Sequence, residues 1–217
     1  GINKYVFDKH PYANSVIGSM EDLDAAELQE FKDFFKKYYA PNNAVLVVAG
    51  DIDVAKTKAM VKNYFGAIPS GEEVARVDIK ETPISETITA TEYDDNIQIP
   101  AKLYVYRTPS MKERDAYILE MISSILTDGK SSRMYKKMVD QDKTALQVLA
   151  FTRPQEDYGT YIMGALPLGD TELSTLATAM DEEINKLKNE LISEREYQKL
   201  QNKFENNFVS SNSSIQG

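Results

Sequence analysis

The N-terminal part of the chain is organised by residues 10–53, which read HPYANSVIGSMEDLDAAELQEFKDFFKKYYAPNNAVLVVAGDID. Asp24 followed by Glu27 has the spacing of a capping-box-like helix start, and apolar residues then recur at helical intervals. The sequence Pro-Asn-Asn at 41–43 should end that helix. Its apolar stripe consists of Leu28, Phe31, Phe35 and Tyr38.

Residues 44–49 (AVLVVA) form a continuous apolar run, which is typical of a strand buried on both faces. Asp53 is placed to cap a second helix. The stretch up to about Ile68 therefore predicts helix, strand, helix. A buried strand needs neighbours, and this part of the chain offers no second clear strand, so we expect the partner strands before Gly1. The second helix would be apolar at Val54, Val61 and Phe65.

The composition changes between Pro69 and Pro83, where the sequence PSGEEVARVDIKETP has no periodicity and is flanked by proline. We expect an inter-domain linker there. The predicted organisation is the end of a first α+β domain (residues 1–68), the linker (69–83) and a second α+β domain (84–217). The second domain ends on a helix without a closing strand, so we expect it to be incomplete at its C-terminus.

Strands and helices occur in pairs in the second domain, without strict alternation, which predicts an α+β fold. Alternating or apolar runs predict strands at 86–93, 101–107, 145–152 and 158–166. Helical periodicity predicts helices at 116–126, 132–139, 171–191 and 193–208, the last with Ser193 and Glu196 in capping-box positions.

Composition excludes several classes of function. The formal net charge of −9 argues against nucleic-acid binding, which requires basic patches. The longest uninterrupted apolar run, at 44–50, is too short to span a bilayer. The N-terminus lacks the basic and apolar regions of a signal peptide. The absence of cysteine excludes disulfides and thiolate metal sites.

Several short blocks follow one another along nearly the whole chain: HPY at 10–12, VIGSMEDLD at 16–24, YYAPNNAVLVVAGDID at 38–53, YFGAIPSG at 64–71, DGKSSRMYKKMV at 128–139, and ALQV, QEDYG and YIMGALP within 145–167. In this order and spacing the blocks resemble the insulinase/pitrilysin family of zinc metallopeptidases. The resemblance implies the α+β metallohydrolase fold of the processing-peptidase/insulinase type, with antiparallel-rich mixed sheets and paired helices.

The zinc ligands of that family are absent from this chain. The family binds zinc through the two histidines of H-x-x-E-H and a downstream glutamate. This chain has one histidine, His10, and no cysteine, which cannot supply the ligands of such a site. The resemblance implies a parent enzyme that binds zinc through residues before Gly1. We accordingly assign no catalytic, cofactor-binding or metal-ligating residue to this chain, and give His10 a structural role in the HPY turn.

The family also uses an arginine and a tyrosine, seven residues apart, to help bind substrate from the half that faces the zinc. The block at 134–148 places Val139 and Leu146 at these positions. The pair is thus absent, which the resemblance relates to the zinc-bearing half, whose own second domain need not carry it. The resemblance implies that this chain is a non-zinc-binding portion of a zinc metalloendopeptidase, forms part of the substrate chamber and contacts a facing half-molecule or partner subunit. A non-catalytic scaffold or peptide-binding paralogue of the same fold fits the missing pair equally well. We expect no nucleic-acid or membrane partner, some self-association, and a location in a bacterial periplasm or cell envelope.

The remaining motifs favour structural interpretations. Gly129-Lys130-Ser131 mimics the end of a phosphate-binding loop, but Ser124 stands where that motif requires glycine, so we expect a helix–helix turn. Ser131, Ser132 and the serines at 210–214 lack a nearby histidine in sequence to activate them. The acidic clusters at 21–24, 94–95 and 156–157 fit helix starts and turns better than metal sites. Tyrosines 104, 106, 158 and 161 either line a peptide surface or, as we favour, pack in the sheet.

Overall fold

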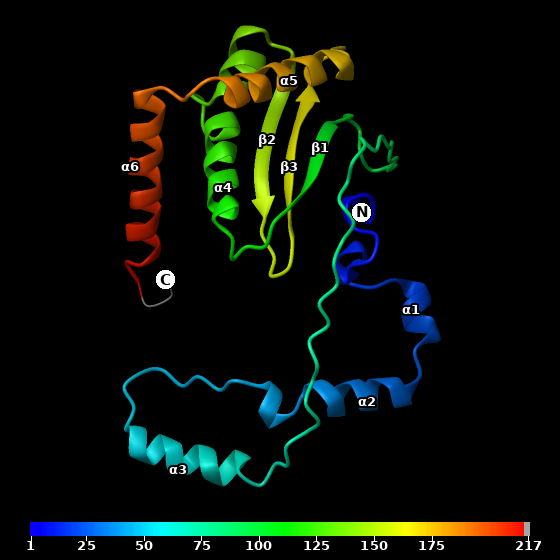
Figure 1. Ribbon diagram of the computed structural model, residues 1–217, viewed down its shortest axis with the longest axis vertical. Coiled ribbons are helices and arrows are strands. Elements are labelled where there is room, and N and C mark those ends of the chain that lie inside the picture. The colour runs from blue at the N-terminus through cyan, green and yellow to red at the C-terminus, as the bar shows by residue number, and fades with distance from the viewer. Residues whose placement is uncertain (215–217) are drawn as a thin grey trace. The chain divides into compact units, whose positions relative to one another are not determined.

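The computed structural model describes residues 1–214, which form two compact units (Figure 1). Unit 1 contains Gly1, Asn3 and residues 7–83; unit 2 contains Ile2, residues 4–6 and the chain from residue 84 onward. Both units contain helices, and unit 2 adds an antiparallel sheet, so the fold class is α+β, as predicted. None of the helices within residues 1–214 has the length and apolarity required to cross a membrane.

Unit 1 is built from short helices, most of which begin at a residue whose side chain caps the first turn. The carboxylate of Asp53 accepts a hydrogen bond from the Lys56 amide at 3.0 Å, which confirms the predicted cap. The predicted start at Asp24 was wrong, because Asp24 lies inside a separate short helix and a capping box between Glu27 and Glu30 begins the next one. The elements are η2 (Pro11–Ala13), α1 (Met20–Ala25), α2 (Leu28–Tyr38), η3 (Pro41–Asn43) and α3 (Val54–Phe65).

Residues 44–49 are extended but belong to no sheet in the described chain, so the predicted strand was wrong in that respect. A strand is defined by hydrogen bonds to neighbours, and no partner strand lies in unit 1. The apolar side chains consequently remain open, with Val45 91% and Val47 78% exposed. Residues 86–93, whose alternating pattern predicted a strand, form none either, because they pair with none of the three strands of unit 2.

The sheet of unit 2 has three antiparallel strands in the order β1-β3-β2. The strands are β1 (Lys102–Thr108), β2 (Ala145–Arg153) and β3 (Gly159–Pro167), close to three of the predicted ranges. β3 lies in the centre, with Tyr161 opposite Tyr106 on one side and Ile162 opposite Phe151 on the other. β2 is therefore an edge strand, and a bulge between Ala145 and Gln147 shifts its register.

The helices of unit 2 confirm the predicted pattern. They are α4 (Arg114–Thr127), α5 (Leu173–Asn189) and α6 (Glu194–Ser211). The π-helical segment η4 (Tyr135–Gln141) overlaps the predicted helix at 132–139 and ends two residues later. α4 packs against β2 and α5 against β3, and α6 runs beside α4 (Figure 1). They enclose one core, whose fully buried members include Leu126, Met134, Met138, Met163, Leu176 and Met180.

Candidate functional site

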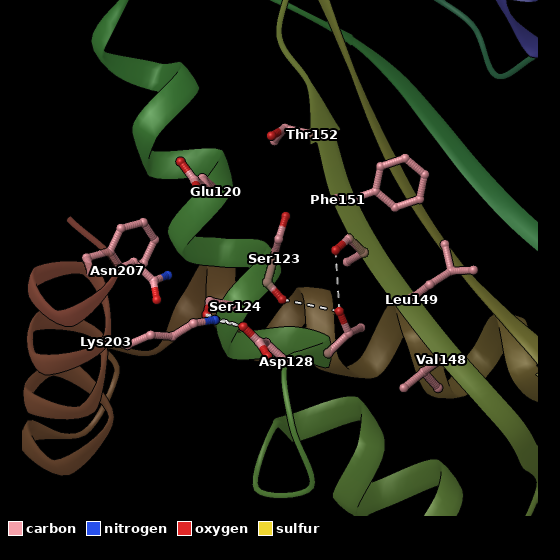
Figure 2. A pocket seen from close by; sticks show the side chains of 13 residues that line it. Glu120, Ser123, Ser124, Asp128, Val148, Leu149, Phe151, Thr152, Lys203 and Asn207 are labelled. Carbon is pink, nitrogen blue, oxygen red and sulfur yellow. Dashed lines mark hydrogen bonds and ion pairs between the residues drawn. The ribbon is translucent and has the colours of Figure 1, made fainter. Parts of the chain in front are cut away.

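A cleft lies beside the edge strand of the sheet in unit 2, between α4, β2 and α6 (Figure 2). Its volume is about 480 Å³, within the range of small-molecule and peptide side-chain pockets. The strand contributes the run of residues 148–152, so the cleft follows the edge of β2. The helices contribute Glu120, Ser123, Ser124, Thr127, Asp128, Lys203, Phe204 and Asn207.

The polar groups at one end of the cleft satisfy one another. The ammonium group of Lys203 donates to the hydroxyl of Ser124 at 2.8 Å and forms an ion pair with Asp128 (Figure 2). Ser124 in turn donates to Asp128 at 3.2 Å. Burial lowers the pKa of Lys203 from the ordinary value of a lysine. These contacts join α6 to the C-terminal end of α4.

The hydroxyls in the middle of the cleft are bonded to the backbone. Thr127 lies within hydrogen-bond distance of the carbonyls of Ser123 (3.3 Å) and Ala150 (3.4 Å), which links α4 to β2. Ser123 donates to the Leu119 carbonyl at 3.0 Å. The cleft contains no histidine among the residues that line it, so it offers binding groups and no activated hydroxyl nucleophile.

The face of the sheet opposite the core carries apolar side chains that are partly open. The core takes alternate residues of β3, including Tyr161 and Met163. On the other face, Ile162 of the central strand is itself buried at 3% exposure. The side chains on the outer strands are more open, with Phe151 on β2 36% exposed and Leu103 on β1 42% exposed. Together with the outer edge of β2, this surface presents backbone groups and apolar side chains to a ligand.

His10 has the structural role that its sequence context predicted. It precedes η2, and its Nδ1 accepts a hydrogen bond from the amide of Tyr12 at 3.2 Å. The side chain is 6% exposed, and its ring centroid is 4.1 Å from that of Tyr12. The amides of Asp8, Lys9 and His10 donate to one carboxylate oxygen of Glu81, at 3.0, 2.9 and 2.7 Å, so this loop is held from within unit 1.

The two positions that the resemblance aligns with the substrate-binding arginine and tyrosine lie in different environments. Val139, in η4, is partly buried against the core cluster. Leu146 is 50% exposed and lies at the bulge that begins β2. Both side chains are hydrocarbon, so neither donates a hydrogen bond to a peptide.

Of the four tyrosines predicted to pack in the sheet, Tyr161 and Tyr104 are in packed environments. Tyr161 is 5% exposed in the core, where burial raises its pKa. Burial, followed by the nearby Asp181, raises the pKa of Tyr104 to about 12. Tyr106 remains 48% exposed, and the ring of Tyr158 faces the guanidinium of Arg107 at 5.7 Å.

The turn at 128–132 connects α4 to the segment before η4, as predicted. Gly129 has a φ of +74°, which favours glycine, and Ser132 donates from its amide and its hydroxyl to the Gly129 carbonyl. Ser131 accepts a hydrogen bond from Lys199 at 2.7 Å. The acidic clusters also lie in helix starts and turns: Asp22 accepts from Ser19 before α1, and Asp94 accepts from the Asn96 amide.

Sequence reasoning missed the cations around this turn. Arg195, Lys199 and Lys203 recur every four residues along α6, which puts them on one face of the helix. This four-residue spacing is visible in the sequence and predicts a basic helix face, although the net charge of the whole chain is −9. Within residues 1–214, no group of three or more histidine, cysteine or acidic residues is arranged to hold a metal ion, so the residues present do not fit a zinc site.

Comparisons with known proteins place the chain in a family. The sequence profile described as "Peptidase M16 inactive domain" matches residues 25–204. The zinc protease PqqE of Helicobacter pylori is 28% identical over 95% of this chain and 46% of its own length; the non-peptidase homolog YmxG of the same organism is 23% identical over 68% and 34%. A crystal structure of a protease from Helicobacter pylori superposes with a TM-score of 0.83 at 26% identity, over 96% of this chain and 51% of that chain.

The chain thus spans about half the length of these relatives. The profile match includes α2 and α3 of unit 1 and the sheet with its covering helices in unit 2. The matched residues include the helix at Leu28–Tyr38, the three-stranded sheet and the turn at 128–132. Because the match covers most of the chain, the chain belongs to the peptidase M16 inactive domain family.

Proposed function

We propose that this chain is the non-zinc-binding part of a zinc metalloendopeptidase, and that it supplies a wall of the chamber in which a peptide is held. The single observation that carries the proposal is the match of residues 25–204 to a domain described as the inactive domain of peptidase M16. The naming of a relative as a zinc protease supports the activity of the whole protein. Zinc, when bound by ligands outside this chain, would supply a polarised water for peptide hydrolysis.

The part of this chain in that activity is to bind and orient the peptide. The outer edge of β2 has no neighbouring strand in the described sheet, so its backbone groups are placed to pair with an extended segment, which is how many peptides are recognised. Leu103 and Phe151 offer apolar contacts on the open sheet face. The net charge of −9 favours basic or unstructured peptides through long-range attraction.

The proposal includes a partner and a location. A facing half-molecule or a partner subunit of the same family would lie across the peptide from this chain. A bacterial periplasm or cell envelope is the proposed compartment. Neither nucleic acid nor a membrane is proposed as a partner.

The first test compares the chain alone with the whole protein. The 217-residue chain, loaded with zinc and dialysed, should retain no stoichiometric metal and should not cleave a quenched fluorescent peptide library. The full-length protein should cleave it in a chelator-sensitive manner. Stoichiometric zinc of sub-micromolar affinity on the chain alone would contradict the proposal, as would chelator-sensitive cleavage by the chain alone that is lost on changing His10.

The second test addresses the sheet surface in the full-length protein. Phe151→Asp should raise KM by about tenfold, because it places a charge on the apolar face beside β2, while kcat changes less. Leu191→Asp is the matched control, since Leu191 is 98% exposed between α5 and α6. Equal KM and kcat values for the two variants would show that the sheet face does not bind the peptide.

A non-catalytic scaffold or peptide-binding paralogue is the second candidate. It is favoured by Val139 and Leu146 at the aligned arginine and tyrosine positions and by the relative named as a non-peptidase homolog. The two candidates differ in the parent protein: an H-x-x-E-H motif before residue 1 supports the peptidase. Peptide binding without cleavage by the full-length protein supports the paralogue.

A further inference from the structure

A second cavity in unit 2 gathers positive charge in a chain that is acidic overall. It has a volume of about 660 Å³ and lies between the end of α4 with the turn that follows it, η4, and the first turns of α6. Two carboxylates and three serine hydroxyls also line it. The cations are Lys130, Lys136, Arg195, Lys199 and Lys203; the carboxylates are Asp140 and Glu196; the hydroxyls are Ser124, Ser131 and Ser132.

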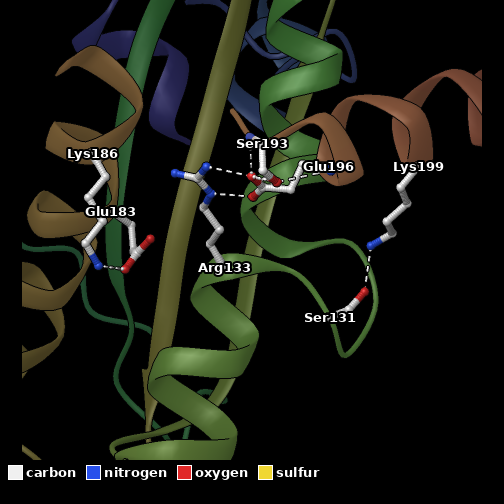
Figure 3. A network of polar contacts seen from close by, with 7 residues as sticks. All are labelled: Ser131, Arg133, Glu183, Lys186, Ser193, Glu196 and Lys199. Atoms are coloured by element: carbon white, nitrogen blue, oxygen red, sulfur yellow. Dashed lines mark hydrogen bonds and ion pairs between the residues drawn. The ribbon is translucent and has the colours of Figure 1, made fainter. Parts of the chain in front are cut away.

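Local structure accounts for the gathering of these cations. The four-residue spacing of Arg195, Lys199 and Lys203 aligns them along one face of α6. The turn at Gly129, with its positive φ, directs the chain so that Lys130 and Ser131 come next to that face. Figure 3 shows Lys199 reaching across to Ser131, over a distance of 2.7 Å.

The carboxylates do not neutralise this cluster. Glu196 is engaged by Arg133, whose guanidinium donates to both of its oxygens at 2.7 and 3.0 Å (Figure 3). Lys203 is the one lining cation with an ion pair in the described chain, to Asp128. Lys199 binds a neutral hydroxyl.

Three cations remain without a side-chain partner. Within residues 1–214, the side chains of Lys130, Lys136 and Arg195 form no hydrogen bond or ion pair, and all three are exposed. Like charges held around one cavity repel each other, and a bound anion relieves that repulsion. The unpaired cations are therefore available to a ligand and favour an anionic one.

We propose that this cavity binds a small anion that carries two or more phosphate groups. Its volume lies in the range of small-molecule sites. Lysine ammonium groups are established phosphate binders. The hydroxyl of Ser131, which accepts a hydrogen bond from Lys199, adds a donor beside them. Lys203 is paired with Asp128, and Glu196 with Arg133, which leaves four lining cations against the single carboxylate of Asp140. This excess is more than one carboxylate group of a ligand would neutralise.

The site differs from a nucleotide-hydrolysing loop. Ser124 stands where such a loop requires glycine, and a helix rather than a strand leads into the turn. The serine hydroxyls are bonded to Lys199, to Lys203 or to the Gly129 carbonyl. We therefore propose that the cavity binds the anion and does not transfer a phosphoryl group.

The test is calorimetric titration of the 217-residue chain with tripolyphosphate, at low salt and at about 0.15 M salt, where surface electrostatics are screened beyond about 8 Å. Binding should be saturable with one ligand per chain. The double variant Lys130→Gln, Lys136→Gln should weaken the affinity by about tenfold or more, since a hydrogen bond to a charged group corresponds to about a tenfold change in affinity. Both residues are exposed, so the variant should fold normally.

The matched control is Lys143→Gln, Lys188→Gln, which removes the same charge from exposed positions outside the cavity. It should leave the affinity within about twofold of the unchanged chain. Equal loss of affinity in the two double variants would show non-specific attraction and overturn the proposal, as would the absence of binding at low salt. Tighter binding of a tetraglutamate peptide or of citrate than of tripolyphosphate would overturn the assignment to phosphate.

Discussion

Arg133 and Glu196 form a two-pronged ion pair, with Nε to Oε1 at 2.7 Å and Nη2 to Oε2 at 3.0 Å. Their side chains are 18% and 31% exposed. The same carboxylate accepts a hydrogen bond from the Ser193 amide at 2.9 Å, so Glu196 both closes the capping box of α6 and fastens that helix to the segment before η4. One side chain thus connects local helix formation with tertiary packing.

We expect Glu196→Gln to lower the free energy of unfolding by about 1–2 kcal/mol. Glutamine retains the acceptor that the capping box needs but lacks the charge that pairs with Arg133, so the variant isolates the ion pair. Urea denaturation followed by circular dichroism measures the change. Glu194→Gln, at an exposed position on the same helix, is the control and should change stability by less than about 0.5 kcal/mol.

The same pair predicts a dependence of stability on pH. Hydrogen bonds from Arg133, with those from Ser193, lower the pKa of Glu196 from 4.5 to about 2 in the folded chain. Because the folded pKa lies below the unfolded one, this contribution is fully present above about pH 4.5 and is lost as the pH falls toward 2. The free energy of unfolding of Glu196→Gln should fall less steeply over this interval. Parallel pH profiles for the two proteins would contradict the assignment.

Local patterns predicted the elements that depend on near neighbours in sequence. The capping box of Ser193 and Glu196 spans three residues, and the hairpin of β2 and β3 joins consecutive strands, so both were readable. The ion pair between Arg133 and Glu196 joins residues 63 apart, and no periodicity encodes it. Residues 44–49 show the converse, because their composition favours a strand while pairing depends on segments elsewhere.

The candidate sites divide in the same way. The absence of zinc ligands followed from a count of histidine and cysteine. The cleft beside β2 requires the strand order β1-β3-β2, which was not predicted from the sequence. The cationic cavity combines a helix face with a turn some sixty residues earlier, a juxtaposition that only the packing of α6 against α4 creates.

Gly164, in the centre of the sheet, should not tolerate a side chain. A Cβ there would lie 2.7 Å from the Lys102 carbonyl oxygen and 2.4 Å from a Leu103 methyl carbon. We expect Gly164→Ala to lower the free energy of unfolding by about 1–3 kcal/mol, because β1 must shift away from β3. Gly169→Asn is the control, since that position has open space and a φ of +58° that asparagine tolerates. Equal urea midpoints for the two variants would contradict the close approach of β1 and β3.

The segment 69–83 should be the first internal site of limited trypsin digestion. Its beginning is held by Asn42, which exchanges hydrogen bonds with Gly71, and its end by Glu81. Between them, Arg76 and Lys80 are exposed and lie in no helix or strand. Mass spectrometry should detect cleavage at these two residues before any within 101–208. Earlier cuts in the latter range would show that the domain boundary was misplaced.

Residues 44–49 should make the 217-residue chain self-associate at high concentration. Val45, Leu46, Val47 and Val48 are 91%, 57%, 78% and 46% exposed, and the extended backbone has no strand beside it in the described chain. Such a segment offers both backbone hydrogen bonds and apolar surface to a second copy. Light scattering should therefore show a mass that rises with concentration.

The test of this surface is the double variant Val45→Lys, Val47→Lys, which places two charges on the side of the extended segment that is most open. It should shift the association toward the monomer, because like charges on an edge disfavour pairing. The control is Val16→Lys, Val77→Lys, at positions that are 105% and 71% exposed outside the segment, and it should associate like the unchanged chain. Hydrogen exchange gives an independent measure: amides at 44–49 should exchange faster than those at 145–152, which are paired in β2. A concentration-independent monomer with equal protection of the two segments would mean that residues 44–49 are already covered within a single chain.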